Sequence, residues 1–352
     1  MFAGVLRFRG TPFFYGTHWF PWKSQEASML LRDYDRIACA KKLLALHPDP
    51  IPRYIIYRDL LGYDSEHPDY CAAYEAVLSH PHVEKIAAAQ NERGFWEPFH
   101  GTTEGMIRRL LSFGLDCTHP TLAAVRDYLI RLLEGKESTG QYEKQDHPRW
   151  YSEMFEPLIA ASMLSLLVPD HPLVDRHRAL WVSFAEEIFS HGDYDEDYDR
   201  AVKASHFGYT VSRPIPPFNY YCLLLTCPVN GKSYLTEKTD RALVDYCMKQ
   251  MPALGYVYNE PPGIPIPIDT CRRDSRDFWH WVRALSIIAP YKGFEVFEKT
   301  ICAHLMSQRE ENGLWTFPRK FDFSLSDRFA GTHKTVDSSL FVLRMLAGRR
   351  GY

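Results

Sequence analysis

Three side chains in the C-terminal third of the sequence could together hold a metal ion. Asp269 and Cys271 are separated by one residue, and His333 follows Cys271 by 62 positions. A carboxylate, a thiolate and an imidazole form a mixed ligand set that suits zinc with an open fourth position. We therefore expect zinc as a cofactor if the fold brings these three residues together. The alternative is a capping Asp, a buried Cys and a surface His.

Further polar residues stand where apolar segments begin, and their types suit acid–base chemistry on an apolar substrate. Carboxylates and imidazoles can transfer protons, and aromatic rings bind apolar groups and stabilise cations. The predicted catalytic residues are Glu104, Asp269, Asp274, Asp337 and His333. The predicted substrate-binding residues are Arg53, Tyr57, His100, Tyr151, Tyr220 and Trp279. Alternatively, residues at the start of a helix, such as Thr103, only cap that helix, and each cap would stabilise the protein by about 1 kcal/mol.

A repeat indicates which elements position these residues. The dipeptide His-Pro recurs every 52 residues, at 67–68, 119–120 and 171–172. Gly62 and Gly114 precede the first two copies, and Gly favours a helix C-terminus whereas Pro favours the first turn of the next helix. Each copy therefore predicts a helix, a short turn and a second helix.

The two helices of each pair differ in character. Segment 120–134 is amphipathic, whereas segment 158–168 is apolar nearly all round, as expected of a buried helix. Expected inner helices cover 52–62, 102–114, 156–168, 217–227, 275–289 and 335–347. Expected outer helices cover 26–46, 68–89, 120–134, 172–190, 236–250 and 292–307.

Alternating inner and outer helices form a solenoid, and six such pairs can close into a ring. The sequence therefore predicts an all-α protein, a single (α/α)6 toroid over residues 1–352 with six inner and six outer helices. The inner helices would run in one direction, so their N-termini would converge at one rim and favour an anion there. Residues 1–25 are expected to be an aromatic extension that covers the opposite opening or mediates homo-oligomerisation.

Two segments resemble the QW motifs of squalene and oxidosqualene cyclases, in which Gln is followed a few residues later by Gly-x-Trp. They run from Gln90 to Trp96 and from Gln308 to Trp315. In that family the motif ends an outer helix and ties it to the next turn. The resemblance to the terpenoid cyclases extends over residues 50–347 and implies an α/α toroid.

The Asp269-x-Cys271 pair and the later His333 also resemble the zinc ligands of the β subunits of protein prenyltransferases. This resemblance implies a zinc-dependent transferase. The sequence departs from that family at Thr332-His333-Lys334-Thr335, where prenyltransferases have Tyr-His-x-x-Tyr, and those enzymes need a helical partner subunit. Lys334 beside the imidazole should weaken metal binding.

Bulk properties exclude several classes of function. The net charge is −3 and no basic stretch is long enough to follow a phosphate backbone, so we expect no nucleic-acid partner. The longest apolar run covers 158–168, against the roughly 20 residues of a membrane span, and the N-terminus lacks a secretory signal. We therefore expect a cytoplasmic protein without a transmembrane segment. The eight cysteines form no CxxC pair and indicate reduced structural thiols.

Two other segments have an unusual composition, one acidic and one rich in proline. The acidic run 193–199 resembles neither a buried cyclase acid nor a calcium loop, and we interpret it as a solvated loop. The proline-rich segment 261–268 should be stiff and extended, and it would hold Asp269 in place, form part of a lid or act as a spacer.

Our leading hypothesis is a terpenoid cyclase- or prenyltransferase-like enzyme. It would act on a small hydrophobic, isoprenoid-like substrate in an aromatic-lined cavity, as an isomerase, lyase or cyclase. One alternative is a glycan hydrolase or lyase, since six-pair barrels also host these enzymes. The other alternative is a noncatalytic binding or scaffold protein.

Overall fold

The computed structural model describes residues 33–141, 148–208, 220–229, 232–250, 285, 287–316 and 334–346. Within these ranges the regular elements are helices, and the only β contact is an isolated bridge between Val229 and Lys232. The all-α prediction is confirmed. The predicted N-terminal extension, 1–25, lies outside the described residues.

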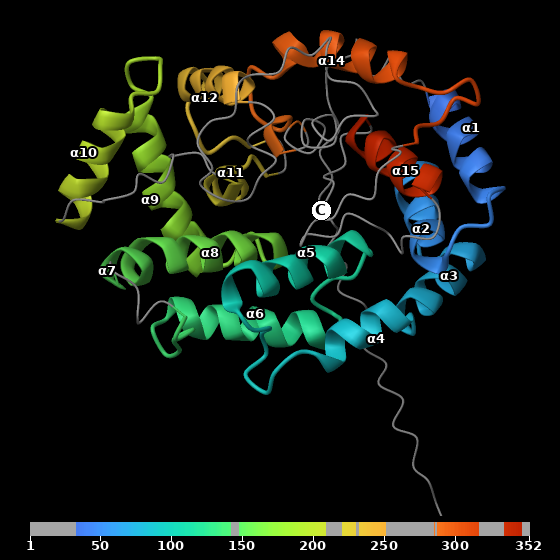
Figure 1. Cartoon of the computed structure of the whole chain (residues 1–352), viewed down its shortest axis with the longest axis horizontal. Coiled ribbons are helices and arrows are strands. Elements are labelled where there is room, and N and C mark those ends of the chain that lie inside the picture. The colour runs from blue at the N-terminus through green and yellow to red at the C-terminus, as the bar shows by residue number, and fades with distance from the viewer. Residues whose placement is uncertain are drawn as a thin grey trace, which may run out of the picture.

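The helices follow one another around a ring, with one set facing the middle and another outside it (Figure 1). The inner elements are α2 (Pro50–Ile55) continued by the π-helix η2 (Ile56–Leu61), α5 (Glu104–Ser112), α8 (Glu156–Leu167), α11 (Tyr220–Thr226) and α15 (Lys334–Leu346). The outer elements are α1 (Asp33–Leu44), α3 (Pro68–Leu78), α4 (Pro81–Ala88), α6 (Pro120–Leu133), α9 (Pro172–Ile188), α12 (Glu237–Gln250) and α14 (Glu295–Ser307). Most of the fifth predicted inner helix, 275–289, lies outside the described residues, so closure into a toroid stays a prediction.

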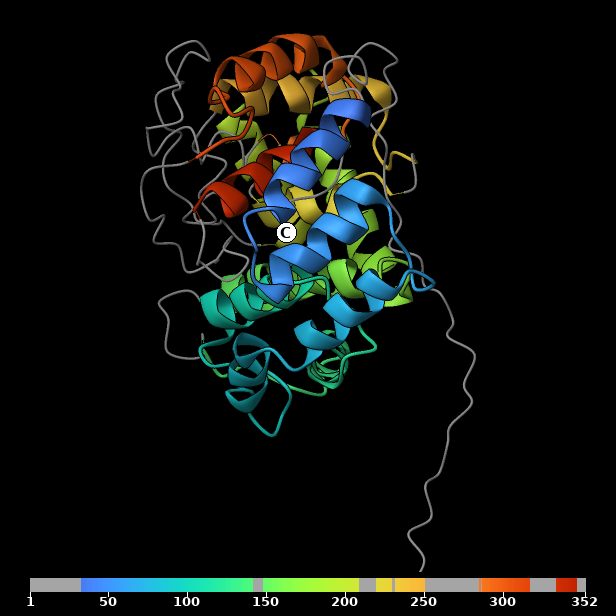
Figure 2. The same ribbon diagram turned by 90° about the vertical axis from the view of Figure 1, so that its right-hand side faces the viewer.

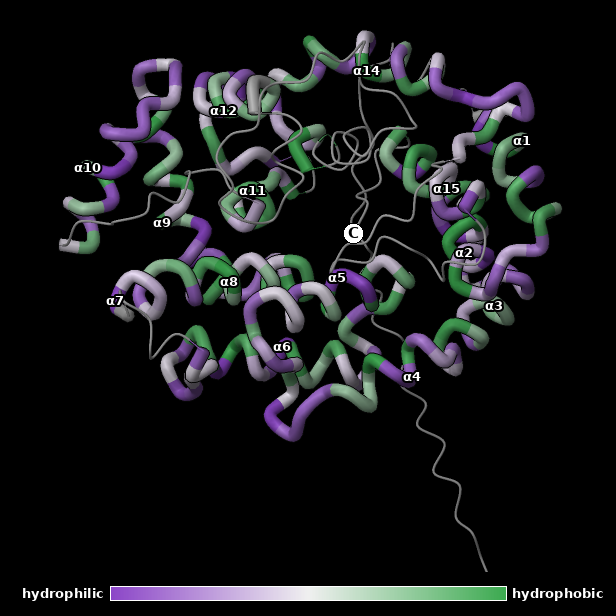
Figure 3. Tube along the Cα trace, viewed as in Figure 1, coloured by the Kyte–Doolittle hydropathy of each residue, from purple (hydrophilic) through white to green (hydrophobic). Residues whose placement is uncertain are grey.

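Helix α8 shows how the layers pack. It contacts α6 and α9 on the outside and α11 along the ring. Every residue from Leu158 to Ser165 is buried, and its trace is coloured largely hydrophobic in Figure 3. The outer helices α12 and α14 lie at the same end of the molecule in Figures 1 and 2, and Arg241 of α12 pairs with Glu295 of α14 at 3.3 Å. An apolar inner helix packed against amphipathic outer helices is what the sequence pattern predicted for 156–168.

The first and last described inner helices are neighbours. Helix α15 packs against α2 and η2. There, the Arg344 Nε and Asp59 Oδ2 atoms lie 2.9 Å apart, and Arg58 Nε donates to Asp59 Oδ1 at 2.7 Å. Asp59 and Arg344 are both buried, so this ion pair joins the first and the last described inner helices inside the protein.

The His-Pro dipeptides begin outer helices. In His67, His119 and His171 the ring Nδ1 accepts the backbone N–H of the residue two positions later, at 3.2, 3.3 and 3.2 Å. His80 does the same for His82 at 3.1 Å and begins α4. The predicted single outer helix over 68–89 is therefore wrong. It is divided into α3 and α4, because Pro81 lacks the N–H that would continue α3.

The two QW-like segments form the same turn. The indole N–H of Trp96 donates to Ile86 O at 2.9 Å, and that of Trp315 donates to Leu305 O at 2.8 Å. Each Trp backbone N–H and C=O also pairs with one hydroxyl of the next inner helix. That hydroxyl belongs to Thr103 for Trp96 and to Ser339 for Trp315. Thr103 therefore does not cap its own helix but attaches it to the preceding outer helix.

The polar residue that begins each turn differs between the two copies. Gln90 Nε2 donates to Gly94 O at 2.9 Å. In the second copy Arg309 Nε donates to Gly313 O at 2.8 Å, so Arg309 rather than Gln308 takes the place of Gln90. The resemblance in sequence thus misaligned the second motif by one residue, whereas the backbone turn is shared.

The acidic run 193–199 is not a solvated loop throughout. Asp195 caps α10 (Glu196–Phe207), and Asp199 is fully buried in its first turn. Lys203, also fully buried, donates to Asp199 Oδ2 at 2.8 Å. The helical spacing of four residues between these two charges was the signal that the loop interpretation missed.

Two further expectations concern membranes and thiols. None of the described helices combines the length and hydrophobicity that a membrane crossing requires. The described cysteines, at 39, 71, 117, 222, 227, 247 and 302, all carry free thiols.

Candidate functional site

Glu104 lies at the start of inner helix α5 and is 1% exposed. Its Oε1 accepts the backbone N–H of Gly101 at 2.5 Å, and its Oε2 accepts a hydrogen bond from the Tyr221 hydroxyl. Gly101 has φ of 92°, a conformation that a side chain would strain, and this turn directs its N–H toward the carboxylate. Both oxygens of Glu104 are therefore held by partners from two segments.

His100 lies beside this carboxylate, in the turn η3 (Phe99–Thr103). Its Nε2 is 3.6 Å from Glu104 Oε1, which is too long for a hydrogen bond. Burial lowers the pKa of His100 to about 4, so the imidazole is neutral at pH 7. A neutral imidazole next to a buried carboxyl group can accept or pass on a proton.

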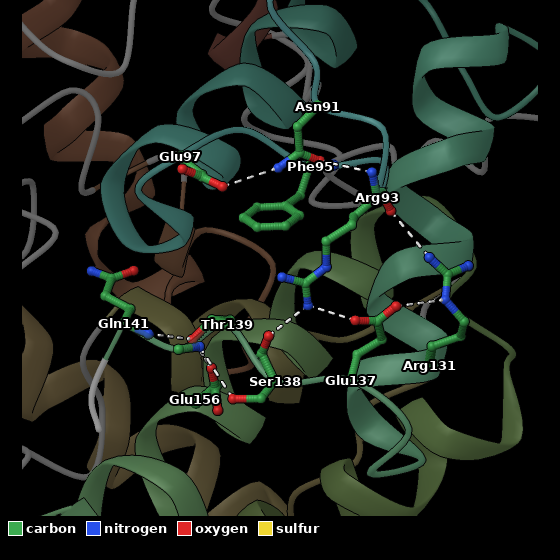
Figure 4. A network of polar contacts seen from close by, with 11 residues as sticks. Asn91, Arg93, Phe95, Glu97, Arg131, Glu137, Ser138, Thr139, Gln141 and Glu156 are labelled. Carbon is green, nitrogen blue, oxygen red and sulfur yellow. Dashed lines mark hydrogen bonds and ion pairs between the residues drawn. The ribbon is translucent and has the colours of Figure 1, made fainter. Parts of the chain in front are cut away.

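An outer turn, whose polar contacts are drawn in Figure 4, is linked to the backbone of His100. Arg93, within the first QW-like segment, donates to Glu137 Oε2 at 2.5 Å and to Ser138 O at 2.6 Å. These bonds attach the segment 137–141 to the turn. Gln141, at the end of that segment, accepts the backbone N–H of His100 through its Oε1 at 2.8 Å.

Aromatic rings surround the pair of His100 and Glu104. Phe155, in η4 (Tyr151–Phe155), meets His100 edge-on at 5.0 Å between ring centroids and Tyr221 at 6.0 Å. Trp150, at the end of α7 (Pro148–Trp150), stacks on Phe155 at 5.3 Å and is met edge-on by Tyr151. These rings come from the N-terminal ends of α8 and α11. The starts of three inner helices, α5, α8 and α11, therefore lie together, and the convergence of all six at one rim stays a prediction.

The predicted site residues fall into three groups. Glu104, His100, Tyr151 and Tyr220 belong to this cluster. The contacts above do not extend to Arg53, which donates to Pro48 O at 2.9 Å, to Tyr57, which stacks on Tyr63, or to Asp337, in the first turn of α15. Asp269, Cys271, Asp274, Trp279 and His333 lie outside the described residues, and with them the predicted zinc site.

Two residues of the cluster were missed. Tyr221 follows the predicted Tyr220 directly, and both belong to a helix whose described side chains are buried all round, so both face neighbouring elements. Arg108 follows Glu104 by one helical turn, and its guanidinium carbon lies 4.6 Å from the centroid of the Tyr220 ring. Spacing of four residues from a predicted carboxylate could have identified Arg108.

The cluster combines a carboxyl group, a neutral imidazole and a phenol within a wall of aromatic rings. No family model matches the chain, and no curated protein and no solved structure matches it. A function for this protein is therefore inferred from the chemistry of these side chains. Carboxyl and imidazole groups transfer protons, and ring faces stabilise a developing cation in an apolar site.

Proposed function

We propose that the protein is an enzyme that acts on a small hydrophobic, isoprenoid-like substrate by acid–base chemistry, with Glu104 as the acid–base group. The observation that carries this proposal is the placement of the Glu104 carboxyl group. It is buried, held by Tyr221 and Gly101, and flanked by His100. A proton-transfer group needs such fixed orientation and exclusion of bulk water to act on an apolar substrate.

The proposed reaction is an isomerisation, hydration, elimination or small cyclisation. In an isomerisation, protonated Glu104 gives its proton to an alkene carbon, and the Phe155 and Tyr221 rings stabilise the resulting cation. The Glu104 carboxylate then takes a proton from an adjacent carbon, so the enzyme returns to its starting state. The Tyr221 hydroxyl donates to the carboxylate while it is charged.

Product formation tests this proposal. Purified protein is incubated with geranyl, farnesyl and geranylgeranyl diphosphate and the matching alcohols, and products are identified by gas chromatography with mass spectrometry. We expect a product with the wild type and a loss of turnover of about 100-fold or more in Glu104→Gln. Glu75→Gln, at an exposed position of α3, is the matched control and should keep full turnover. Absence of any product, or equal turnover in Glu104→Gln, contradicts the proposal.

A further inference from the structure

Arg108 is a buried cation in the interior of the ring. It lies on α5 one helical turn after Glu104 and is 4% exposed. Its guanidinium is stacked on Tyr220, with 4.6 Å between the guanidinium carbon and the ring centroid. Among the residues that the structure describes, the Nε and Nη1 atoms of Arg108 have no hydrogen-bond partner.

Such an environment is unusual for arginine. Arginine is almost never fully buried unless it is paired, because an uncompensated charge in the interior is strongly unfavourable. The carboxylate nearest in sequence, Glu104, accepts from Tyr221 and Gly101 instead, and no ion pair joins it to Arg108. The Tyr220 ring compensates only part of the charge, through a cation–π contact.

We propose that Arg108 binds an oxyanion, the phosphate or carboxylate group of the substrate. A guanidinium presents its N–H donors in a planar array that fits these oxygens, and its weak hydration suits a buried site. The contact with the Tyr220 ring holds the guanidinium in place, and the unpartnered N–H groups bind the anion. Since Arg108 follows Glu104 by four residues, about 6 Å along the helix, the anion would anchor a substrate whose reacting carbon lies at Glu104.

This inference rests on the proposed function for the role of the anion, but binding can be measured without turnover. Isothermal titration calorimetry at low salt uses three probes: inorganic diphosphate, farnesyl diphosphate and laurate. We expect at least one probe to bind the wild type and to bind Arg108→Gln at least tenfold more weakly. Arg176→Gln, at an exposed position of α9, should bind as the wild type does. Binding of the diphosphates identifies a phosphate group, and binding of laurate alone identifies a carboxylate.

Two further variants separate binding from folding and from catalysis. Without ligand, Arg108→Gln and Arg108→Met should unfold at or above the wild-type temperature, because each removes an uncompensated buried charge. Glu104→Gln should still bind the probe, even though it should not turn a substrate over. Equal affinity of wild type and Arg108→Gln for every probe that binds, or binding of none of the probes to the wild type, overturns the inference.

Discussion

The Tyr221 hydroxyl on α11 donates a hydrogen bond to the Glu104 carboxylate on α5, although the two residues are 117 positions apart. Tyr221→Phe keeps the ring and removes this bond. We expect a loss of about 1–3 kcal/mol in the free energy of unfolding, since the acceptor is buried and loses this donor. Urea unfolding measures this loss. The control is Tyr63→Phe, at a partly exposed position. A loss no larger than that of the control would contradict a strong contact between the two helices.

The shared Trp turns give a second prediction. Thr103→Val and Ser339→Ala each leave the backbone N–H and C=O of a buried Trp without their hydroxyl partner. Each should lower the free energy of unfolding by about 1–3 kcal/mol. Ser152→Ala, at an exposed position, should change it by less than about 0.5 kcal/mol. If only one of the two substitutions destabilises the protein, the turns are not equivalent.

Much of this fold could be predicted from local signals. The His-Pro dipeptides begin helices because Pro lacks the N–H that the first turn leaves unpaired, and the His ring supplies a cap. The division at Pro81 and the helix α10 were missed for related reasons. His80-Pro81 lies outside the period of 52 residues, and the charges of 193–199 concealed a helix whose Asp199 is buried by pairing with Lys203.

A third prediction concerns the ion pair between the first and last described inner helices. Asp59→Asn would leave Arg58 and Arg344 beside a neutral amide in a buried site. We expect a loss of about 3–5 kcal/mol in unfolding free energy. The double variant Asp59→Asn/Arg344→Met should lose less unfolding free energy than the two single variants lose in sum.

The matched control is a surface pair. Asp127 pairs with Arg126 on α6, where its side chain is 52% exposed. Asp127→Asn should therefore change stability by less than about 1 kcal/mol. Equal effects of Asp59→Asn and Asp127→Asn would show that the buried pair does not stabilise the packing of α15 on η2.

Stability should depend on pH through His100. Burial lowers its pKa to about 4 from 6.5, so between these values the unfolded chain binds more protons than the folded one. The contribution of His100 is complete above pH 6.5 and is lost as the pH falls toward 4. Relative to His100→Gln, the wild type should therefore lose about 3 kcal/mol of unfolding free energy as the pH falls through this window.

Comparing two variants removes the other titrating groups. His177, whose pKa is also lowered to about 4, and Asp240, whose pKa burial raises to about 6, are common to both proteins. His191→Gln, at an exposed position, is the matched control. A pH-independent difference between wild type and His100→Gln would show that the ring is not held neutral.

The candidate site was only partly predictable. Glu104, His100 and Tyr220 follow from the rule that inner helices start at one rim. The bond between Glu104 and Tyr221 depends on how α5 and α11 approach each other, and periodicity carries no information on that distance. Arg108 was missed because a cation in an inner helix contradicts the apolar pattern used to find such helices.

The role of Glu104 in proton transfer is tested most directly by running the reaction in heavy water. Mass spectrometry then measures the rate of product formation and the deuterium that the product has taken from solvent. We expect solvent deuterium in the isomerised, hydrated or cyclised product of wild type and Glu75→Gln. Glu104→Gln should be slower by about 100-fold or more. Product formed by Glu104→Gln at the wild-type rate, with the same deuterium content, would contradict a role for this carboxyl group.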